Sequence, residues 1–223
     1  MRPTRIVAWF LAGGIAGYAL IWLVVTLVIL AMSGAARNAE RAAPPRPANP
    51  AAVPGIKRFA HVDDRVWRGA APTAGGYRRL ARLGVRTVVD LRAERPAREA
   101  ARGPRRAGLE VVRLPVRDGQ APTDAQVDRF VSVVERARGP VFVHCGAGVG
   151  RTGAMSAAYL VRTGRADAST ATLRSLAAGP PTLEQLSFMR RLGRDRAGRP
   201  PVLLVALSRV ADSPRRSWTR LRE

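Results

Sequence analysis

The chain has 223 residues, enough for one domain of ordinary size and additional segments. Its 38 Lys and Arg residues outnumber its 16 Asp and Glu residues, and the formal net charge of +22 suits acidic partners such as phosphorylated substrates, anionic lipids or nucleic acid. The single cysteine excludes an intramolecular disulfide and a multi-cysteine metal site, and two histidines argue against a metal centre built from a histidine cluster. Because aromatic residues make up only 5% and no nucleic-acid-binding module is visible, we expect no nucleic-acid partner.

An apolar run without a charged residue extends from Ile6 to Met32. It exceeds the roughly 20 residues that a helix needs to cross a bilayer, and the roughly 7–15 residues of a signal-peptide core. We therefore expect residues 1–32 to form an uncleaved single-pass membrane anchor, although the small residues after Met32 would also permit cleavage. The numbers of arginines before and after this apolar run are nearly equal. The positive-inside rule therefore favours a cytoplasmic position for the following domain only slightly.

Two further segments flank the predicted domain, which covers residues 53–196. Residues 33–52 are rich in alanine and proline, which predicts an extended, semi-rigid spacer. Residues 197–223 form a basic tail that contains the apolar run Val202–Leu207. This run fits equally well with packing on the domain and with lying on an anionic membrane surface.

Strand and helix patterns alternate along the domain. The expected strands are residues 56–62, 66–68, 85–91, 109–114 and 141–143. The expected helices are residues 73–83, 123–138, 153–161, 166–178 and 183–192, while residues 94–107 are helical at best and broken at Gly103–Pro104. Thr123 with Gln126, and Thr182 with Gln185, match the pattern of a capping box. The alternation predicts an α/β fold with a mostly parallel central sheet flanked by helices.

The segment Val141–Gly153 reads VFVHCGAGVGRTG, a short apolar strand followed by a glycine-rich loop and a helix. The strand leads into the only cysteine, Cys145, and the helix begins near Arg151. Three glycines allow the backbone N–H groups between these two residues to turn inward and bind an anion. The residues that would do so are Gly146, Ala147, Gly148, Val149 and Gly150.

The same spacing suits phosphate chemistry. The helix N-terminus adds a positive dipole end, and Arg151 can hold two phosphate oxygens bidentately. This positive field favours the thiolate form of Cys145, which is the nucleophilic form. The hydroxyl of Thr152 could donate a hydrogen bond to the sulfur and help it leave.

The string H-C-x-A-G-x-G-R-T-G resembles the signature of cysteine-dependent protein tyrosine and dual-specificity phosphatases. The stretch V-W-R-G-A-A-P-T…L-G-V-R-T-V-V-D-L-R-A-E is similar to the front half of compact members, bacterial ones included, so the resemblance covers roughly residues 54–192. It implies that Cys145 is the nucleophile, Arg151 the phosphate clamp and Thr152 the leaving-group helper, with His144 supporting the loop and the thiolate. It also implies a phosphocysteine intermediate, a phosphorylated protein substrate, and no metal or organic cofactor.

Members of this family carry an aspartic acid on the loop before the helix that leads to the cysteine strand. Here that loop contains Asp118, followed by Gly119, and we expect Asp118 to be the general acid. Asp124 is the competitor, but its place in the first turn of a helix is already explained by the helix dipole.

Four other polar residues have structural explanations. We expect Asp90, Arg92 and Glu94 to form ion pairs at the end of a strand, with Arg92 as a candidate brace of the cysteine loop. Gln185 matches a helix cap, although a glutamine in this region positions the hydrolytic water in some relatives.

The leading hypothesis is a membrane-anchored phosphatase acting on phosphotyrosine, with phosphoserine and phosphothreonine as further candidates. A phosphoinositide or inositol phosphate ranks second, because no basic residue lies between Cys145 and Arg151, although Arg117 could compensate. The third hypothesis is a non-catalytic phosphate-binding module. The presence of Cys145, Arg151 and a candidate acid together argues against it.

Overall fold

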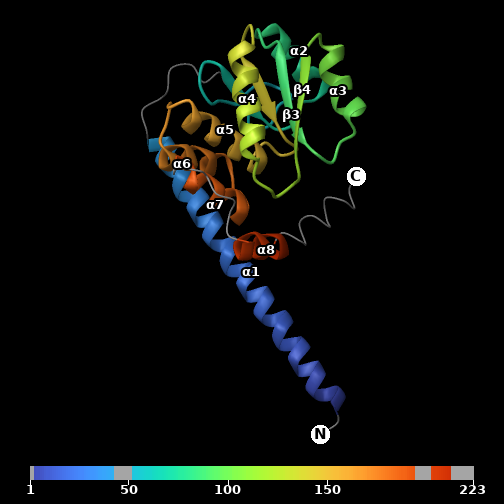
Figure 1. The fold of residues 1–223 in the computed structure, drawn as a ribbon, viewed down its shortest axis with the longest axis vertical. Coiled ribbons are helices and arrows are strands. Elements are labelled where there is room, and N and C mark those ends of the chain that lie inside the picture. Colours follow the sequence, from blue (N-terminus) through green and yellow to red (C-terminus); the bar gives the residue numbers. More distant parts are fainter. Residues whose placement is uncertain (1–2, 43–51, 194–201, 212–223) are drawn as a thin grey trace.

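A five-stranded sheet places the cysteine strand at its centre. The computed structural model describes residues 3–42, 52–193 and 202–211 (Figure 1). The strand order is β1-β2-β5-β3-β4, and the bounds are β1 Ala60–His61, β2 Val66–Gly69, β3 Thr87–Arg92, β4 Glu110–Val116 and β5 Val141–His144. Among these strands only β1 pairs antiparallel with its neighbour, so the predicted α/β fold with a mostly parallel sheet is confirmed.

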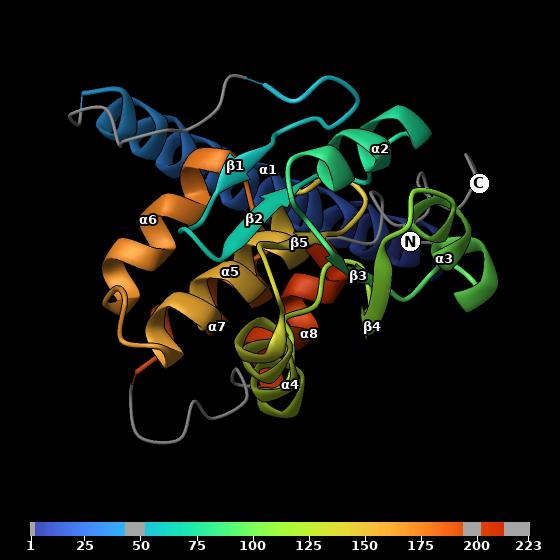
Figure 2. The same ribbon diagram turned by 90° about the horizontal axis from the view of Figure 1, so that it is seen from above.

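Helices cover both faces of the sheet (Figures 1 and 2). Their bounds are α2 Ala74–Arg82, α3 Ala97–Arg106, α4 Asp124–Arg136, α5 Gly150–Arg162, α6 Ala168–Ala178 and α7 Leu183–Arg191. Neighbouring residues of a strand face opposite sides, and here they join two separate hydrophobic cores. Val89 and Val143 belong to the core that includes residues of α4 and α5, whereas Val88 and Phe142 belong to the core that includes residues of α2.

The N-terminal helix α1 spans Pro3–Ala42 without interruption. Its stretch Gly13–Ala42 is long and apolar enough to cross a membrane, by length and composition. The last turns of α1 pack against α6 and bury Ser33 and Ala36.

The extended conformation that we expected after Met32 is therefore wrong for Ser33–Ala42, which is helical. The physical reason is local: the prolines of this segment begin only at Pro44, and alanine, arginine and glutamate before it favour a helix. The prolines of the predicted spacer that precede Ala52 lie outside the described residues.

Two other expectations need correction. The strand expected over residues 56–62 is reduced to β1, because the chain turns at Val53–Ile56 and Arg58 has a positive φ of 55°. Gly103–Pro104 does not break α3. Pro104 lies in the last turn, so its missing N–H removes one helical hydrogen bond near the end, where the carbonyl of Pro104 accepts from Ala107 N–H at 2.9 Å.

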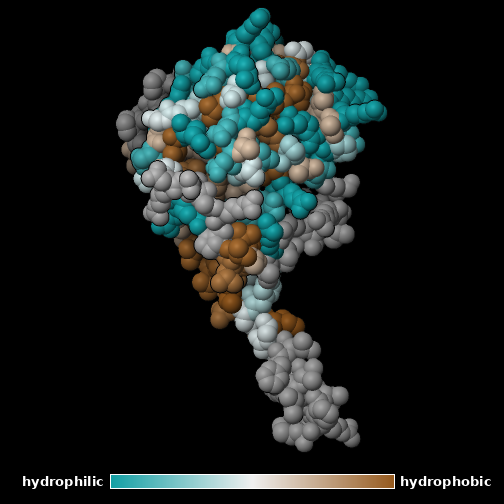
Figure 3. All heavy atoms as spheres, in the orientation of Figure 1, coloured by the Kyte–Doolittle hydropathy of each residue, from teal (hydrophilic) through white to brown (hydrophobic). Residues whose placement is uncertain are grey.

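Part of the predicted tail forms α8, Val202–Ala211, which packs against α7. Ser208 is 3% exposed, and its Oγ accepts the N–H of Glu184 at 3.1 Å. Val202 and Leu203 remain exposed, and hydrophobic residues gather where α8 and α1 meet below the domain (Figure 3). Packing on the domain and an exposed apolar face thus occur together in α8, while residues 194–201 and 212–223 lie outside the described part.

Candidate active site

The segment Cys145–Val149, which we call the glycine loop, follows the carboxyl end of β5 and leads directly into α5. Because β5 lies between β2 and β3, residues at the carboxyl ends of both neighbours can reach this loop. The N-cap residue Val149 makes no side-chain hydrogen bond to the first N–H groups of α5. The helix N-terminus therefore keeps backbone donors and its positive dipole end for an anion.

Three consecutive carbonyl groups of the glycine loop are held by donors outside it. The pairs are Gly146 O with Ala71 N–H (3.0 Å), Ala147 O with Arg58 Nη1 (3.2 Å) and Gly148 O with Arg68 Nη2 (2.7 Å). In a trans peptide the C=O and N–H groups point in opposite directions, so the N–H groups of the following residues turn to the other side of the loop. One of them, Gly148 N–H, donates to Cys145 Sγ at 3.3 Å. The loop thus has the geometry of a backbone nest around a cysteine that is 3% exposed.

Two glycines of the loop region are required by close packing. Gly148 has a φ of +71°, and a Cβ there would collide with the backbone of Gly69 and Ala70. A Cβ at Gly150 would collide with the side-chain amide of Gln185. Any larger residue at these positions would displace the nest or its supports.

Arg151 is 4% exposed and is surrounded by acceptors. Its Nη1 donates to Glu94 Oε2 at 2.6 Å and to Val116 O at 3.1 Å, and its Nη2 donates to Glu94 Oε1 at 2.9 Å. Nη2 also lies 3.1 Å from Asp118 Oδ1. The buried Nε finds no hydrogen-bond partner in the described part of the chain, so this guanidinium is fixed in place with one donor unused.

Glu94 is the site residue that sequence reasoning missed. Its bidentate contact orients Arg151, and although partial burial alone would raise the pKa of Glu94, the hydrogen bond and charge of Arg151 lower it. Arg92 instead donates to Asp90, with Nη2–Oδ2 at 2.8 Å, as expected of a structural ion pair. The signal in the sequence was the position of Glu94 just beyond β3, a neighbour of β5.

The two candidate acids lie at opposite ends of α5. Asp118 contacts Arg151, in the first turn of α5, and its side chain is 43% exposed. Asp124 contacts Arg162, the last residue of α5, with 3.6 Å between Nη2 and Oδ1. These arginines are eleven positions apart in the helix, a separation of about 16 Å, so Asp118 is the carboxylate beside the glycine loop.

The N-terminus of α7 holds the segment after Asp118. Thr182 Oγ1 donates to Gly119 O at 2.7 Å, and Gln185 Nε2 donates to Gln120 O at 3.0 Å. The predicted capping box between Thr182 and Gln185 is present, and Gln185 is 1% exposed. Gln185 therefore caps a helix and also links the Asp118 segment to Gly150, a connection that the sequence pattern did not reveal.

His144 is fully buried beneath the loop. Its Nδ1 lies 3.1 Å from Cys145 O, which can only accept, so Nδ1 donates and Nε2 faces the hydroxyl of Tyr77 at 3.4 Å. Burial lowers the pKa of His144 to about 4, although the charge of Asp90 opposes the shift. The ring is therefore neutral at pH 7 and supports the loop through a carbonyl.

We predict a pH dependence of stability from this histidine. Because the folded pKa of about 4 lies below the ordinary value of 6.5, the unfolded chain binds more protons between these values. The stabilisation is complete above pH 6.5 and is lost as pH falls towards 4, by about 3 kcal/mol. Denaturant unfolding of the chain in detergent micelles at pH 7.0 and 4.5 measures it. His144→Asn should show a clearly smaller fall, and an equal fall in both proteins would contradict the prediction.

Thr152 differs from the expectation. Its side chain is fully buried, and Oγ1 has no hydrogen-bond partner among residues 3–42, 52–193 and 202–211, so it does not bond the sulfur. The sulfur instead accepts from Gly148 N–H. At the start of α5, Arg151 Nε and Thr152 Oγ1 are thus buried without an acceptor in the described part of the chain.

Comparison with protein families gives a match over most of the domain. The model described as "PTP-NADK: DSP-PTPase phosphatase fused to NAD+ Kinase" matches residues 56–191. The human dual specificity protein phosphatase CDC14C is 46% identical over 56 residues, which are 25% of this chain and 12% of that protein. Probable NAD kinase 2, chloroplastic, of Oryza sativa subsp. japonica is 34% identical over 119 residues, 49% of this chain and 12% of that protein. The chain thus spans only about an eighth of the length of these relatives.

Solved structures show the same architecture. P. aeruginosa TpbA in complex with pTyr has a TM-score of 0.50 and 27% identity, covering 59% of this chain and 80% of that one. PTPMT1 in complex with PI(5)P has a TM-score of 0.51 and 25% identity, covering 61% and 94%. The core catalytic domain of S. cerevisiae SIW14, at 17% identity and a TM-score of 0.54 over 66% and 91%, shares the fold. With the family model matching more than half of its residues, the chain belongs to the DSP-PTPase family of phosphatase domains.

Proposed function

We propose that the chain is a cysteine-dependent phosphatase that hydrolyses phosphotyrosine in protein substrates and is tethered to a membrane by α1. The observation that carries this proposal is the nest around Cys145 with the fixed guanidinium of Arg151 beside it. In this proposal residues 53–196 are the catalytic domain and residues 1–32 the anchor. Phosphoserine and phosphothreonine are further substrates to be tested.

In the proposed reaction the Cys145 thiolate attacks phosphorus in line, and the P–O bond to the leaving group breaks as the S–P bond forms. The N–H groups of Gly146, Ala147, Gly148, Val149 and Gly150 and the Arg151 guanidinium bind the phosphoryl oxygens. Asp118 gives its proton to the leaving oxygen, and then takes a proton from the water that attacks phosphocysteine and releases the thiolate. Thr152 Oγ1 can turn towards the departing sulfur, and His144 holds the loop through Cys145 O.

We predict that Asp118→Asn slows turnover according to the leaving group. For phenyl phosphate, whose leaving group needs a proton, kcat should fall about 10²–10⁴-fold, and for p-nitrophenyl phosphate much less. Steady-state kinetics with both substrates measures the effect. Asp124→Asn is the matched control, because Asp124 pairs with Arg162 at the far end of α5. An unchanged rate in Asp118→Asn, or the larger loss in Asp124→Asn, would remove Asp118 from the mechanism.

A second candidate substrate is a phosphoinositide or inositol phosphate. It is favoured by Arg117, an exposed residue that directly precedes Asp118 in the chain, and by the likeness to PTPMT1, whose structure contains PI(5)P. No residue between Cys145 and Arg151 is basic, which favours phosphotyrosine as the first candidate.

The test uses the full chain in nanodiscs and measures phosphate release from a phosphotyrosine peptide, a phosphoserine peptide and a phosphoinositide without added metal. The proposal requires the phosphotyrosine peptide to be the best substrate, with activity that Cys145→Ser removes. A preference for the phosphoinositide that Arg117→Gln weakens, and that the exposed-residue control Arg129→Gln does not, would support the second candidate. No release from any of the three would contradict both.

A further inference from the structure

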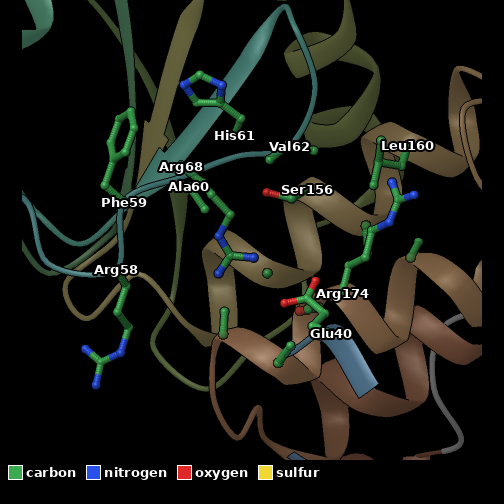
Figure 4. Close-up of a pocket in the computed structure, with 16 residues that line it drawn as sticks. Glu40, Arg58, Phe59, Ala60, His61, Val62, Arg68, Ser156, Leu160 and Arg174 are labelled. Atoms are coloured by element: carbon green, nitrogen blue, oxygen red, sulfur yellow. The ribbon is translucent and has the colours of Figure 1, made fainter. Parts of the chain in front are cut away.

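A separate cavity lies along α5, and none of its lining residues belongs to the glycine loop. It has a volume of about 280 Å³, far above the roughly 10–15 Å³ that one water needs. Residues of β1, β2, α5, α6 and the end of α1 line it (Figure 4). Its ionisable lining residues are three arginines, one histidine and one glutamate: Arg58, Arg68, Arg174, His61 and Glu40.

Three buried side chains of this cavity each carry one polar atom that has no hydrogen-bond partner in the described part of the chain. Arg68, Ser156 and Ser175 are 5%, 4% and 3% exposed. Arg68 Nε, Ser156 Oγ and Ser175 Oγ have no hydrogen-bond partner within the described ranges of the chain. In Figure 4 the guanidinium of Arg68 and the hydroxyl of Ser156 point into the same space. Buried donors without acceptors are costly, so this group is suited to a ligand that accepts hydrogen bonds.

The charge at this place favours an anion. Burial lowers the pKa of Arg68 to about 10, because its cationic form is desolvated, and the charges of Cys145 and Glu40 only partly offset this. The carboxylate of Glu40, carried by the last turn of α1, lies close to Arg68 in the cavity (Figure 4). A side-chain carboxylate therefore already lies where an oxyanion would bind.

We propose that this cavity is a second anion site, which binds a small phosphate-type oxyanion in competition with the Glu40 carboxylate. Arg68 Nε and the hydroxyls of Ser156 and Ser175 are its donors, and the guanidinium of Arg174, which is turned towards Leu160, adds positive charge to the lining (Figure 4). The site is distinct from the nest, and its existence does not depend on the proposed function.

Arg68 connects this anion site to the glycine loop. Its Nη2 donates to Gly148 O at 2.7 Å, and Gly148 N–H donates to Cys145 Sγ. An oxyanion on Nε neutralises part of the charge that Arg68 directs towards Cys145. The cavity is therefore connected to the glycine loop through the Arg68 side chain.

The experiment titrates inorganic phosphate into the full chain in detergent micelles by calorimetry, at constant ionic strength. Cys145→Asp is used as the background, because its carboxylate blocks the nest. One saturable phosphate site is expected to remain. Arg174→Gln should weaken it about 10-fold, whereas Glu40→Gln should tighten it at least about 3-fold because the competing charge is removed. Arg129→Gln, an exposed arginine on α4, is the matched control and should leave the dissociation constant unchanged.

Arg174→Gln and Glu40→Gln are expected to change the dissociation constant for phosphate in opposite directions, and this makes the outcome decisive. Absence of saturable binding in the Cys145→Asp background, or one dissociation constant shared by all these variants, would overturn the proposal. If circular dichroism shows that Arg174→Gln does not fold, Ser156→Ala replaces it, since it removes one donor with little change in volume. The expected result is then a weaker phosphate site with unchanged secondary structure.

Discussion

Cys145→Ser is expected to lower kcat for a phosphotyrosine peptide by at least about 10⁴-fold. A serine hydroxyl is protonated at neutral pH and needs a base to become a nucleophile. The one histidine next to it cannot serve, because Nδ1 of His144 is bound to Cys145 O and Nε2 faces Tyr77. The measurement is the steady-state rate of phosphate release from the full chain in nanodiscs.

The same variant separates chemistry from binding. The nest donors and Arg151 remain in Cys145→Ser, so the affinity for the phosphotyrosine peptide should stay within about 3-fold of the wild type. Rapid acid quench of the wild type with labelled substrate should place phosphate on the peptide that contains Cys145. Turnover by Cys145→Ser above about 1% of wild type, or label on another residue, would contradict the proposed nucleophile.

Arg151→Lys is expected to reduce kcat/KM by about 10²–10³-fold. Lysine keeps the positive charge, but it cannot maintain the bidentate contact with Glu94 and present a second edge to phosphate. Because the charge is kept, the loss measures geometry rather than electrostatics alone. Kinetics with p-nitrophenyl phosphate reports the loss at the phosphoryl group.

Two further variants place this effect at the site. Glu94→Gln should lose less than Arg151→Lys, since it keeps one hydrogen bond to the guanidinium. Arg162→Lys, in the same helix but at its far end, is the matched control and should keep wild-type activity. A loss in Arg162→Lys equal to that in Arg151→Lys would point to general destabilisation of α5.

Local patterns in the sequence were enough to predict most elements of this fold. The capping boxes at Thr123 and Thr182 both form, and the alternation of strands and helices predicted the mostly parallel sheet. The residues from Val141 to Gly153 predicted a strand, a glycine-rich loop and a helix, since each depends on residues that are close in the chain. The predictions were wrong at Ser33–Ala42 and at Gly103–Pro104. The composition of these segments indicated the end of a helix, but in the structure the helix continues through both.

The sequence by itself thus determined the glycine loop and the class of fold, because short-range periodicity and backbone freedom govern both. The tertiary structure decided which distant residues support that loop. Strand order brings Glu94 to Arg151 and Arg68 to Gly148, and the packing of α4 on α5 separates Asp118 from Asp124. These contacts join residues between 33 and 80 positions apart, so no local pattern encodes them and only the folded sheet brings them together.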